Sequence, residues 1–241
     1  MFRDYRLFFK QYVCRFHDTG AIAPSSRWLA AALTRHVAGG AGPRRVLEVG
    51  PGTGAVTRRI VERLGPDDRL DLVELNEQFV AHLQGRFRND PHFASVADRA
   101  TIVHAPLEDL PRNQKYDAIV SGLPLNNFAV AHAEQILAVF GELLAPHGTL
   151  SFFEYVAVRP MRAAVSGRAD RERLRGIGRV LTSALNGNEF QRDLILPNLP
   201  PAWVHHLRFA SRTPACPNNG TSNVADGENR PSGRSAVGGA T

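Results

Sequence analysis

The sequence predicts an α/β fold of the Rossmann-like type, in which seven strands form a mostly parallel sheet flanked by helices. The first observation is an apolar strand at 46–49, a Gly-Pro-Gly-Thr-Gly turn at 50–54 and a helical pattern at 56–64. Such a strand, glycine turn and helix open the sheets that bind nucleotide-like ligands. The second is the alternation of strands and helices that follows. The third is a final pair of strands at 192–196 and 203–210, which we expect to be antiparallel.

Composition limits the domain count and the partners. The 241 residues allow one α/β domain of about 200 residues with two end segments. The net charge of +6 comes almost wholly from arginine, because Lys10 and Lys115 are the only lysines. This excess indicates an anionic lipid or nucleic acid as partner, although a GC-rich genome gives the same bias. Cys14 and Cys216 form no metal-binding pattern, so we expect no metal and a reducing compartment.

The N-terminal segment is predicted to contact a membrane without crossing it. No apolar run approaches the roughly 20 residues of a spanning helix, and the first residues are too charged and aromatic for a secretory signal. Residues 2–17 instead predict a basic amphipathic helix with Phe8, Phe9 and Tyr12 on its apolar face. Such a helix lies in a membrane interface or packs its aromatic face on the domain, and the sequence leaves both open.

Turn residues and apolar spacing predict the remaining elements. Pro24 and the serines after it begin a helix at 26–37, which can fold over the glycine turn as a lid. Residues 159–190, rich in arginine and glycine, predict a broken basic helical insertion. The other expected elements are helices at 77–87, 93–98 and 131–144, strands at 70–74, 100–105, 116–121 and 149–158, and a turn at 146–148. The predicted domains are an interface helix with the lid helix at 1–38, the catalytic domain at 39–210 and a disordered tail at 211–241.

Two acidic residues define the ligand of the glycine turn. Glu48 lies within the first strand, where a turn built for a pyrophosphate would avoid a carboxylate, so it suits a cationic or amine-bearing ligand. Glu74 ends the second strand, where a carboxylate can accept hydrogen bonds from both ribose hydroxyls. A ribose beside a positively charged, non-phosphorylated group describes S-adenosylmethionine. The pair therefore predicts the cofactor site of a class I methyltransferase, against the alternative of a glycine-rich connection in an unrelated α/β enzyme.

Several motifs together resemble the bacterial phospholipid N-methyltransferases. They are Gly-Ala-Ile-Ala-Pro-Ser-Ser at 20–26, Glu-Val-Gly-Pro-Gly-Thr-Gly at 48–54, Glu74, Ser-Gly-Leu-Pro-Leu-Asn-Asn-Phe at 121–128 and Asn-Leu-Pro-Pro-Ala-Trp-Val at 198–204. The resemblance covers nearly all of residues 2–210. It implies a cytoplasmic enzyme bound peripherally to the inner face of the cell membrane. Such enzymes transfer methyl groups from S-adenosylmethionine to the amine of phosphatidylethanolamine or its partly methylated products, and relatives act on ornithine lipids.

One departure from this family leaves the acceptor lipid open. In the phosphatidylethanolamine enzymes of this family the fifth strand ends in Tyr-Gly-Pro, whereas here Tyr155 is followed by valine and alanine and then by the basic insertion. We expect Tyr155 to hydrogen-bond to the acceptor nitrogen or to make a cation–π contact with it. Asn126 or Asn127 would orient the amine or only cap their loop. Strand alternation points Glu154 away from Tyr155, so the two should not face the same site.

The complete candidate site has three parts. The expected cofactor-binding residues are Glu48, Gly50, Gly52, Gly54, Glu74, Leu75, Leu107 and Ser121. Glu108 or Asp109 could meet the adenine amino group or cap the next element. The expected substrate and membrane contacts are Phe8, Phe9, Tyr12, Ile22, Ser25, Ser26, Pro124 and Arg159.

Two other classes of function remain as alternatives. Ribosomal adenine dimethylases share the acid pair and a basic surface, but they carry Asn-Leu-Pro-Tyr after the fourth strand to grip a flipped base. This chain has Ser-Gly-Leu-Pro at 121–124, so we expect no nucleic-acid partner. A catalytically silent membrane-binding scaffold is the other alternative, and the intact Glu48, Gly50, Gly52 and Glu74 argue against it. The sequence makes no prediction of oligomeric state.

Overall fold

The computed structural model describes residues 26–39, 42–156, 167–198 and 200–209. The predictions on the helix at 2–17 and the tail at 211–241 lie outside these ranges. So do six of the expected substrate and membrane contacts, namely Phe8, Phe9, Tyr12, Ile22, Ser25 and Arg159. Within the described ranges, none of the helices has the length and apolar character needed to span a bilayer.

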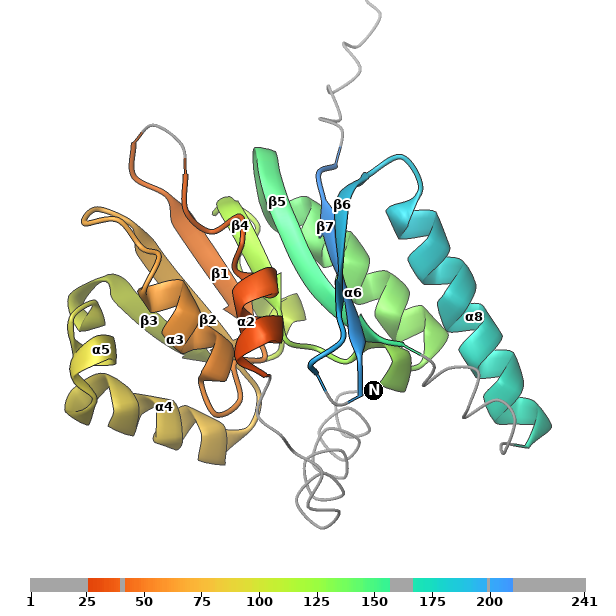
Figure 1. Ribbon diagram of the computed structural model, residues 1–241, viewed down its shortest axis with the longest axis horizontal. Coiled ribbons are helices and arrows are strands. Elements are labelled where there is room, and N and C mark those ends of the chain that lie inside the picture. The colour runs from red at the N-terminus through yellow and green to blue at the C-terminus, as the bar shows by residue number, and fades with distance from the viewer. Residues whose placement is uncertain (1–25, 40–41, 157–166, 199, 210–241) are drawn as a thin grey trace, which may run out of the picture. The chain divides into compact units, whose positions relative to one another are not determined.

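The seven predicted strands form one sheet in the order β3-β2-β1-β4-β5-β7-β6 (Figure 1). The first five strands are parallel, and β7 lies antiparallel between β5 and β6. The strand order reverses between β1 and β4, and sheets of this kind bind ligands at the carboxyl ends beside such a switch point. The strands are β1 (Arg45–Val49), β2 (Arg69–Glu74), β3 (Ala100–His104), β4 (Tyr116–Ser121), β5 (Leu144–Tyr155), β6 (Glu189–Ile195) and β7 (Ala202–Leu207).

Helices cover both faces of the sheet (Figure 1). Val46 and Leu72 belong to a core cluster with side chains of α2, α3, α4 and α5, whereas Leu47 and Val49 belong to a second cluster with α6 and α8. The central strands are buried on both faces, which explains why their sequences are continuously apolar. The helices are α2 (Arg27–Leu33), α3 (Ala55–Val61), α4 (Glu77–Asn89), α5 (Pro91–Ala94), α6 (Val130–Leu143) and α8 (Arg168–Leu185), with 3₁₀ turns η1 (Ala97–Arg99), η2 (Leu107–Asp109) and η3 (Leu125–Asn127).

The predicted lid helix is instead a core helix. Leu29 and Leu33 of α2 are fully buried among residues of α3, β5 and β7. Ser26 caps this helix, since its hydroxyl accepts a hydrogen bond from the Leu29 amide at 3.2 Å. A helix with two fully buried leucines cannot lift off without exposing that apolar surface, so the described part of the segment is not a lid.

Two further predictions concern breaks in the chain. In the described part of the predicted broken insertion, α8 runs without interruption from Arg168 to Leu185, whereas residues 159–166 of that prediction lie outside the described ranges. Gly176 serves close packing there, since a Cβ at this position would lie 2.6 Å from Val130 Cγ2 on α6. The expected turn at 146–148 lies inside the irregular start of β5, where His147 takes a φ of 66° and the register with β4 shifts.

Candidate functional site

The glycine turn adopts a backbone that side chains rarely allow. Gly50, Gly52 and Gly54 have φ values of 70°, 56° and 81°. A Cβ on Gly50 would lie 2.9 Å from Leu123 Cδ2, so the turn packs tightly against the loop after β4. A Cβ on Gly52 would meet no atom of the described residues within 4 Å. The space next to the Gly52 Cα is therefore open, which leaves room for a ligand to approach the backbone of the turn.

Glu74 fixes the turn from the end of β2. Its Oε2 accepts a hydrogen bond from the Gly52 amide at 3.1 Å, and its Oε1 accepts one from the Asn76 amide at 2.8 Å. The residue is 1% exposed, and this burial raises the pKa of its carboxyl group. The hydrogen bonds from the backbone amides lower the same pKa, but burial has the larger effect. Each carboxylate oxygen has further lone pairs, so both can also accept from a ligand hydroxyl.

Glu48 is a buried acid with an unpaired oxygen. Its side chain lies under α3, and its Oε2 has no hydrogen-bond partner among the described residues. Burial raises the pKa of Glu48 to about 8, and the charge of Glu74 adds to this rise. The Thr57 hydroxyl opposes the rise without reaching hydrogen-bonding geometry. An orphan carboxylate of this kind is matched electrostatically by a cationic ligand.

The loop after β4 is built against the glycine turn. The Ser121 hydroxyl is buried and accepts a hydrogen bond from the Leu123 amide at 3.3 Å. Pro124 precedes η3, which carries Asn126 and Asn127. Asn126 is 7% exposed, and its Oδ1 has no hydrogen-bond partner among the described residues. This unsatisfied acceptor, next to the carboxyl end of β4, agrees with a role in orienting an amine.

Two arginines hold the two loops of the site, and sequence analysis missed both roles. Arg86 of α4 donates to the carbonyls of Thr53 and Gly54 at 3.2 and 3.3 Å. Arg173 of α8 donates to the carbonyls of Asn126 and Phe128, both at 3.0 Å. Arg86 lies 32 residues from Gly54 and Arg173 lies 47 from Asn126, so no local pattern could have paired them.

The remaining expected residues line the same edge of the sheet with different partners. Tyr155 packs edge-to-face on Phe153 at 5.0 Å, and burial raises the pKa of its hydroxyl. Leu75 presents its carbonyl to His104 Nε2 at 3.1 Å, and Leu107 is buried in the core. The carboxylate of Glu108 is paired with His132 at 2.8 Å, so its main role is to tie η2 to α6 rather than to meet adenine.

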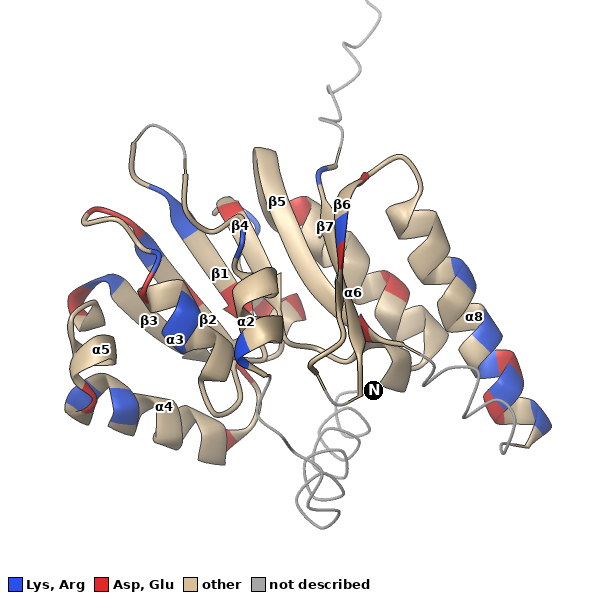
Figure 2. Cartoon of the chain, viewed as in Figure 1, with Lys and Arg blue, Asp and Glu red and all other residues tan. Residues whose placement is uncertain are grey.

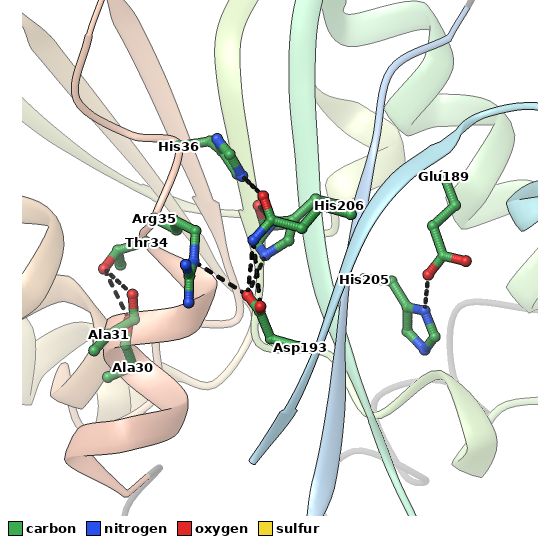
Figure 3. Close-up of polar contacts among 11 residues, drawn as sticks. Ala30, Ala31, Thr34, Arg35, His36, Glu189, Asp193, His205 and His206 are labelled. Carbon is green, nitrogen blue, oxygen red and sulfur yellow. Dashed lines mark hydrogen bonds and ion pairs between the residues drawn. The ribbon is translucent and has the colours of Figure 1, made fainter.

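A Ser-His-Asp chain elsewhere in the sheet is not a hydrolytic site. The Ser151 hydroxyl lies 2.8 Å from His206 Nδ1. His206 Nε2 lies 3.2 Å from Asp193, which also pairs with Arg35, two residues after the end of α2 (Figure 3). Ser151 is 2% and His206 0% exposed, so no substrate can reach them. Burial lowers the pKa of His206 to about 4, so this imidazole stays neutral and joins β5, β6 and β7 to the segment that follows α2.

A prediction on stability follows from the contact between the two loops. A Cβ on Gly122 would lie 2.6 Å from the Gly50 carbonyl oxygen, and backbone at that distance must shift. We expect Gly122→Ala to lower the free energy of unfolding by about 1–3 kcal/mol in urea denaturation, with a loss of cofactor affinity. Gly141→Ala is the matched control, because that helical glycine has nothing within 4 Å and alanine should raise stability by up to ~1 kcal/mol. Equal unfolding midpoints for the two variants would contradict this account of the turn.

A glycine turn between two buried carboxylates, at the switch point of a Rossmann-like sheet, is the site of an α/β enzyme with a nucleoside-type cofactor. A methyltransferase-domain family matches residues 46–148. Ornithine lipid N-methyltransferase from Singulisphaera acidiphila is 31% identical over 149 residues, which are 62% of this chain and 77% of that protein. Ribosomal RNA small subunit methyltransferase A from a Synechococcus strain is 38% identical over 82 residues, 34% of this chain and 28% of that protein.

Solved structures share the fold at low sequence identity. The glycopeptide N-methyltransferase MtfA aligns with a TM-score of 0.57 and 15% identity over 76% of this chain and 90% of that chain. The N-methyltransferase NodS from Bradyrhizobium japonicum, solved with S-adenosyl-L-homocysteine, has a TM-score of 0.54 and 17% identity over 77% of this chain and 87% of that chain. The protein belongs to the class I S-adenosylmethionine-dependent methyltransferases, and S-adenosylmethionine is its cofactor.

The residues of the site fit this cofactor. The orphan oxygen of Glu48 suits the positively charged methionine end, the open space above Gly52 admits the ligand to the turn, and Glu74 retains acceptor capacity for ribose hydroxyls. The bound cofactor supplies an activated methyl group on a sulfonium sulfur. The protein then has to hold an acceptor in line with that methyl group and to exclude water, and it needs no covalent nucleophile.

Proposed function

We propose that this methyltransferase transfers methyl groups to the head-group amine of a membrane lipid, either phosphatidylethanolamine and its mono- and dimethyl products or an ornithine lipid. The observation that carries the proposal is the likeness to the ornithine lipid N-methyltransferase, which extends over 77% of that protein. The likeness to ribosomal RNA methyltransferases spans 28% of their representative. A lipid acceptor therefore accounts for more of the chain than a nucleic acid does.

The acceptor side of the site supports an amine substrate. Methyl transfer needs a neutral nitrogen lone pair within near-attack distance of the methyl group, so the amine must be oriented and must lose a proton. The unpaired Oδ1 of Asn126 can accept a hydrogen bond from the amine, and Asn127 follows it on η3. Tyr155, whose raised pKa keeps its hydroxyl protonated, can donate a hydrogen bond or offer its ring face to a methylated ammonium product.

A basic helix beside the acceptor loop supports a membrane location. Arginines outnumber acidic residues on the N-terminal half of α8 (Figure 2), and Arg173 connects that half to η3. Basic side chains near a bilayer are attracted to anionic lipids. We accordingly propose peripheral binding to the inner face of the cell membrane, with the segment at 2–17 as an interface helix and Pro124, Ser26 and Arg159 near the substrate.

The direct test is thin-layer chromatography of lipids from a bacterial host that expresses the protein and is fed methyl-labelled methionine. We expect labelled methylated phosphatidylethanolamines, or labelled ornithine lipids in a host that makes them. A Glu74→Ala variant is the control, because it should abolish the label without changing the lipid supply. Absence of labelled lipid together with labelled ribosomal RNA would refute the proposal in favour of the nucleic-acid alternative.

A further inference from the structure

Exposed apolar side chains gather near one end of β6. In the part of the chain that the structure describes, the large hydrophobic residues with substantial exposure are Trp28 at 49%, Phe190 at 41%, Leu194 at 42% and Leu196 at 66%. Leu194 is the register partner of Trp203, which is half-buried at the start of β7. Leu194, Leu196 and Trp203 therefore surround the connection between β6 and β7.

Trp28 joins this group through the start of α2. The Ser26 amide, immediately before α2, donates a hydrogen bond to Asn198 Oδ1 at 3.3 Å. Asn198 lies in the connection between β6 and β7, so the first turn of α2, with Trp28, is held beside that connection (Figure 1). We call Trp28, Leu194, Leu196 and Trp203 the edge patch.

The edge patch lies on the same edge of the sheet as the active site. Ala202, the first residue of β7, is the register partner of Tyr155 on β5 and of Ile195 on β6. Phe190 lies at the other end of β6, where it contacts His36 and the Arg208 guanidinium. Leu194 and Leu196 thus lie toward the edge of the sheet that holds the candidate site, Trp28 is held beside the same connection, and Phe190 lies at the opposite edge.

Each tryptophan of the edge patch has an arginine guanidinium packed against its ring. The Arg27 guanidinium lies 4.7 Å from the Trp28 ring centroid, and the Arg192 guanidinium lies 4.7 Å from the Trp203 ring centroid. Both arginines are exposed, and the described residues offer neither of them a carboxylate partner. Tryptophan with arginine beside exposed leucine suits the boundary between lipid head groups and acyl chains, since the rings and leucines are apolar and the guanidinium groups attract phosphates.

We propose that the edge patch, with Arg27 and Arg192, inserts into the head-group region of an anionic lipid bilayer. The proposal rests on the proposed function. Only an acceptor that lies in a membrane would require the edge of the sheet with the candidate site to approach a bilayer. It adds to that function a second membrane contact, separate in sequence from the segment at 2–17. Insertion would bring lipid head groups to the edge where Tyr155 and the loop of Asn126 meet the cofactor site.

Intrinsic fluorescence tests this directly, because Trp28 and Trp203 are the only tryptophans of the chain. The full-length protein is titrated with vesicles of phosphatidylethanolamine and phosphatidylglycerol, with and without brominated acyl chains. We expect a blue shift and quenching by bromine, both lost when phosphatidylcholine replaces the anionic lipid. Trp28→Phe and Trp203→Phe each leave one tryptophan, and each remaining signal should be quenched.

Matched substitutions distinguish vesicle binding through the edge patch from nonspecific hydrophobic adsorption. The double variant Leu194→Ser/Leu196→Ser should weaken vesicle partitioning about tenfold, or about 1.4 kcal/mol, because two leucine side chains no longer bury apolar surface in the bilayer. Phe190→Ser removes a comparably exposed side chain from the opposite edge and should change partitioning less than twofold. Vesicle binding without quenching of either tryptophan would overturn the proposal, and so would edge-patch variants that alter self-association in size-exclusion chromatography but not partitioning.

Assaying methyl transfer on the same vesicles distinguishes this inference from the proposed function. If the tryptophans are quenched but no methylated lipid forms, the edge patch inserts into the bilayer and the proposal of a lipid acceptor is wrong. Methylated lipid without quenched tryptophans would support the acceptor and remove the insertion surface.

Discussion

Replacing Glu74 by alanine is expected to weaken S-adenosylmethionine binding by about 100-fold or more. The carboxylate holds the Gly52 and Asn76 amides at 3.1 and 2.8 Å and keeps acceptor capacity for the ribose hydroxyls. Each hydrogen bond to a charged group contributes about 1.5–3 kcal/mol, so the loss of two to the ligand corresponds to at least two orders of magnitude. Isothermal titration calorimetry of the purified protein measures this affinity.

Two controls make the Glu74 result specific. Glu77→Ala removes a nearby carboxylate at the exposed start of α4 and should leave the affinity unchanged. Glu74→Gln keeps one acceptor oxygen and should lose affinity less severely than alanine does. Thermal unfolding of each variant shows whether the fold survives. A folded Glu74→Ala protein with wild-type affinity would remove Glu74 from the cofactor site.

Replacing Glu48 by glutamine is expected to stabilise the cofactor-free protein and to weaken its binding of the cofactor. Burial raises the pKa of Glu48 from 4.5 to about 8, so the folded protein binds one proton more than the unfolded chain between these pH values. The wild-type free energy of unfolding therefore falls as the pH rises through this window, by up to ~1.4 kcal/mol per pH unit. Glutamine cannot ionise, so at pH 8 the free energy of unfolding of the variant should exceed that of the wild type by about 4 kcal/mol in urea denaturation without cofactor.

Cofactor binding should show the opposite pH dependence. A positively charged ligand favours the ionised form of Glu48, so wild-type affinity should rise between pH 6 and 7.5 and binding should release protons. Calorimetry in two buffers of different ionisation enthalpy measures that release. Glu48→Gln should bind more weakly, with no proton release from this group. Equal proton release by the variant and the wild type would assign the titration to another residue.

The mostly parallel seven-stranded sheet could be predicted from the sequence, and so could the gathering of the glycine turn, Glu48 and Glu74 at one edge of it. The apolar strands and the glycine turn predicted a Rossmann-like sheet, and β7 is antiparallel as expected. Glu48 and Glu74 lie where the turn needs them because adjacent parallel strands place their carboxyl ends at one edge. Glycine and proline were less reliable guides. The glycines within 159–190 indicated a broken helix, whereas α8 is continuous over its described length and Gly176 makes a tight contact with α6.

The acceptor side could be predicted only in part. Asn126 and Tyr155 were expected there from motifs, but the burial of Tyr155 and the lack of a described partner for Asn126 Oδ1 depend on packing. The sequence contains many arginines with similar neighbours, and nothing local separates Arg173, which holds the acceptor loop, from Arg168, which pairs with Glu172 in solvent. A contact between residues 47 positions apart cannot be inferred from the periodicity of a local stretch of sequence.

The sequence by itself determined that this protein is an α/β methyltransferase that uses S-adenosylmethionine, because strand alternation, a glycine turn and two carboxylates are local features with fixed spacing. Only the tertiary structure decided that α2 is part of the core, that Arg86 and Arg173 hold the loops of the site, and that Trp28 lies beside the connection between β6 and β7. Those facts depend on which distant segments pack together, and packing is set by the shape and burial of side chains that no single stretch of sequence contains.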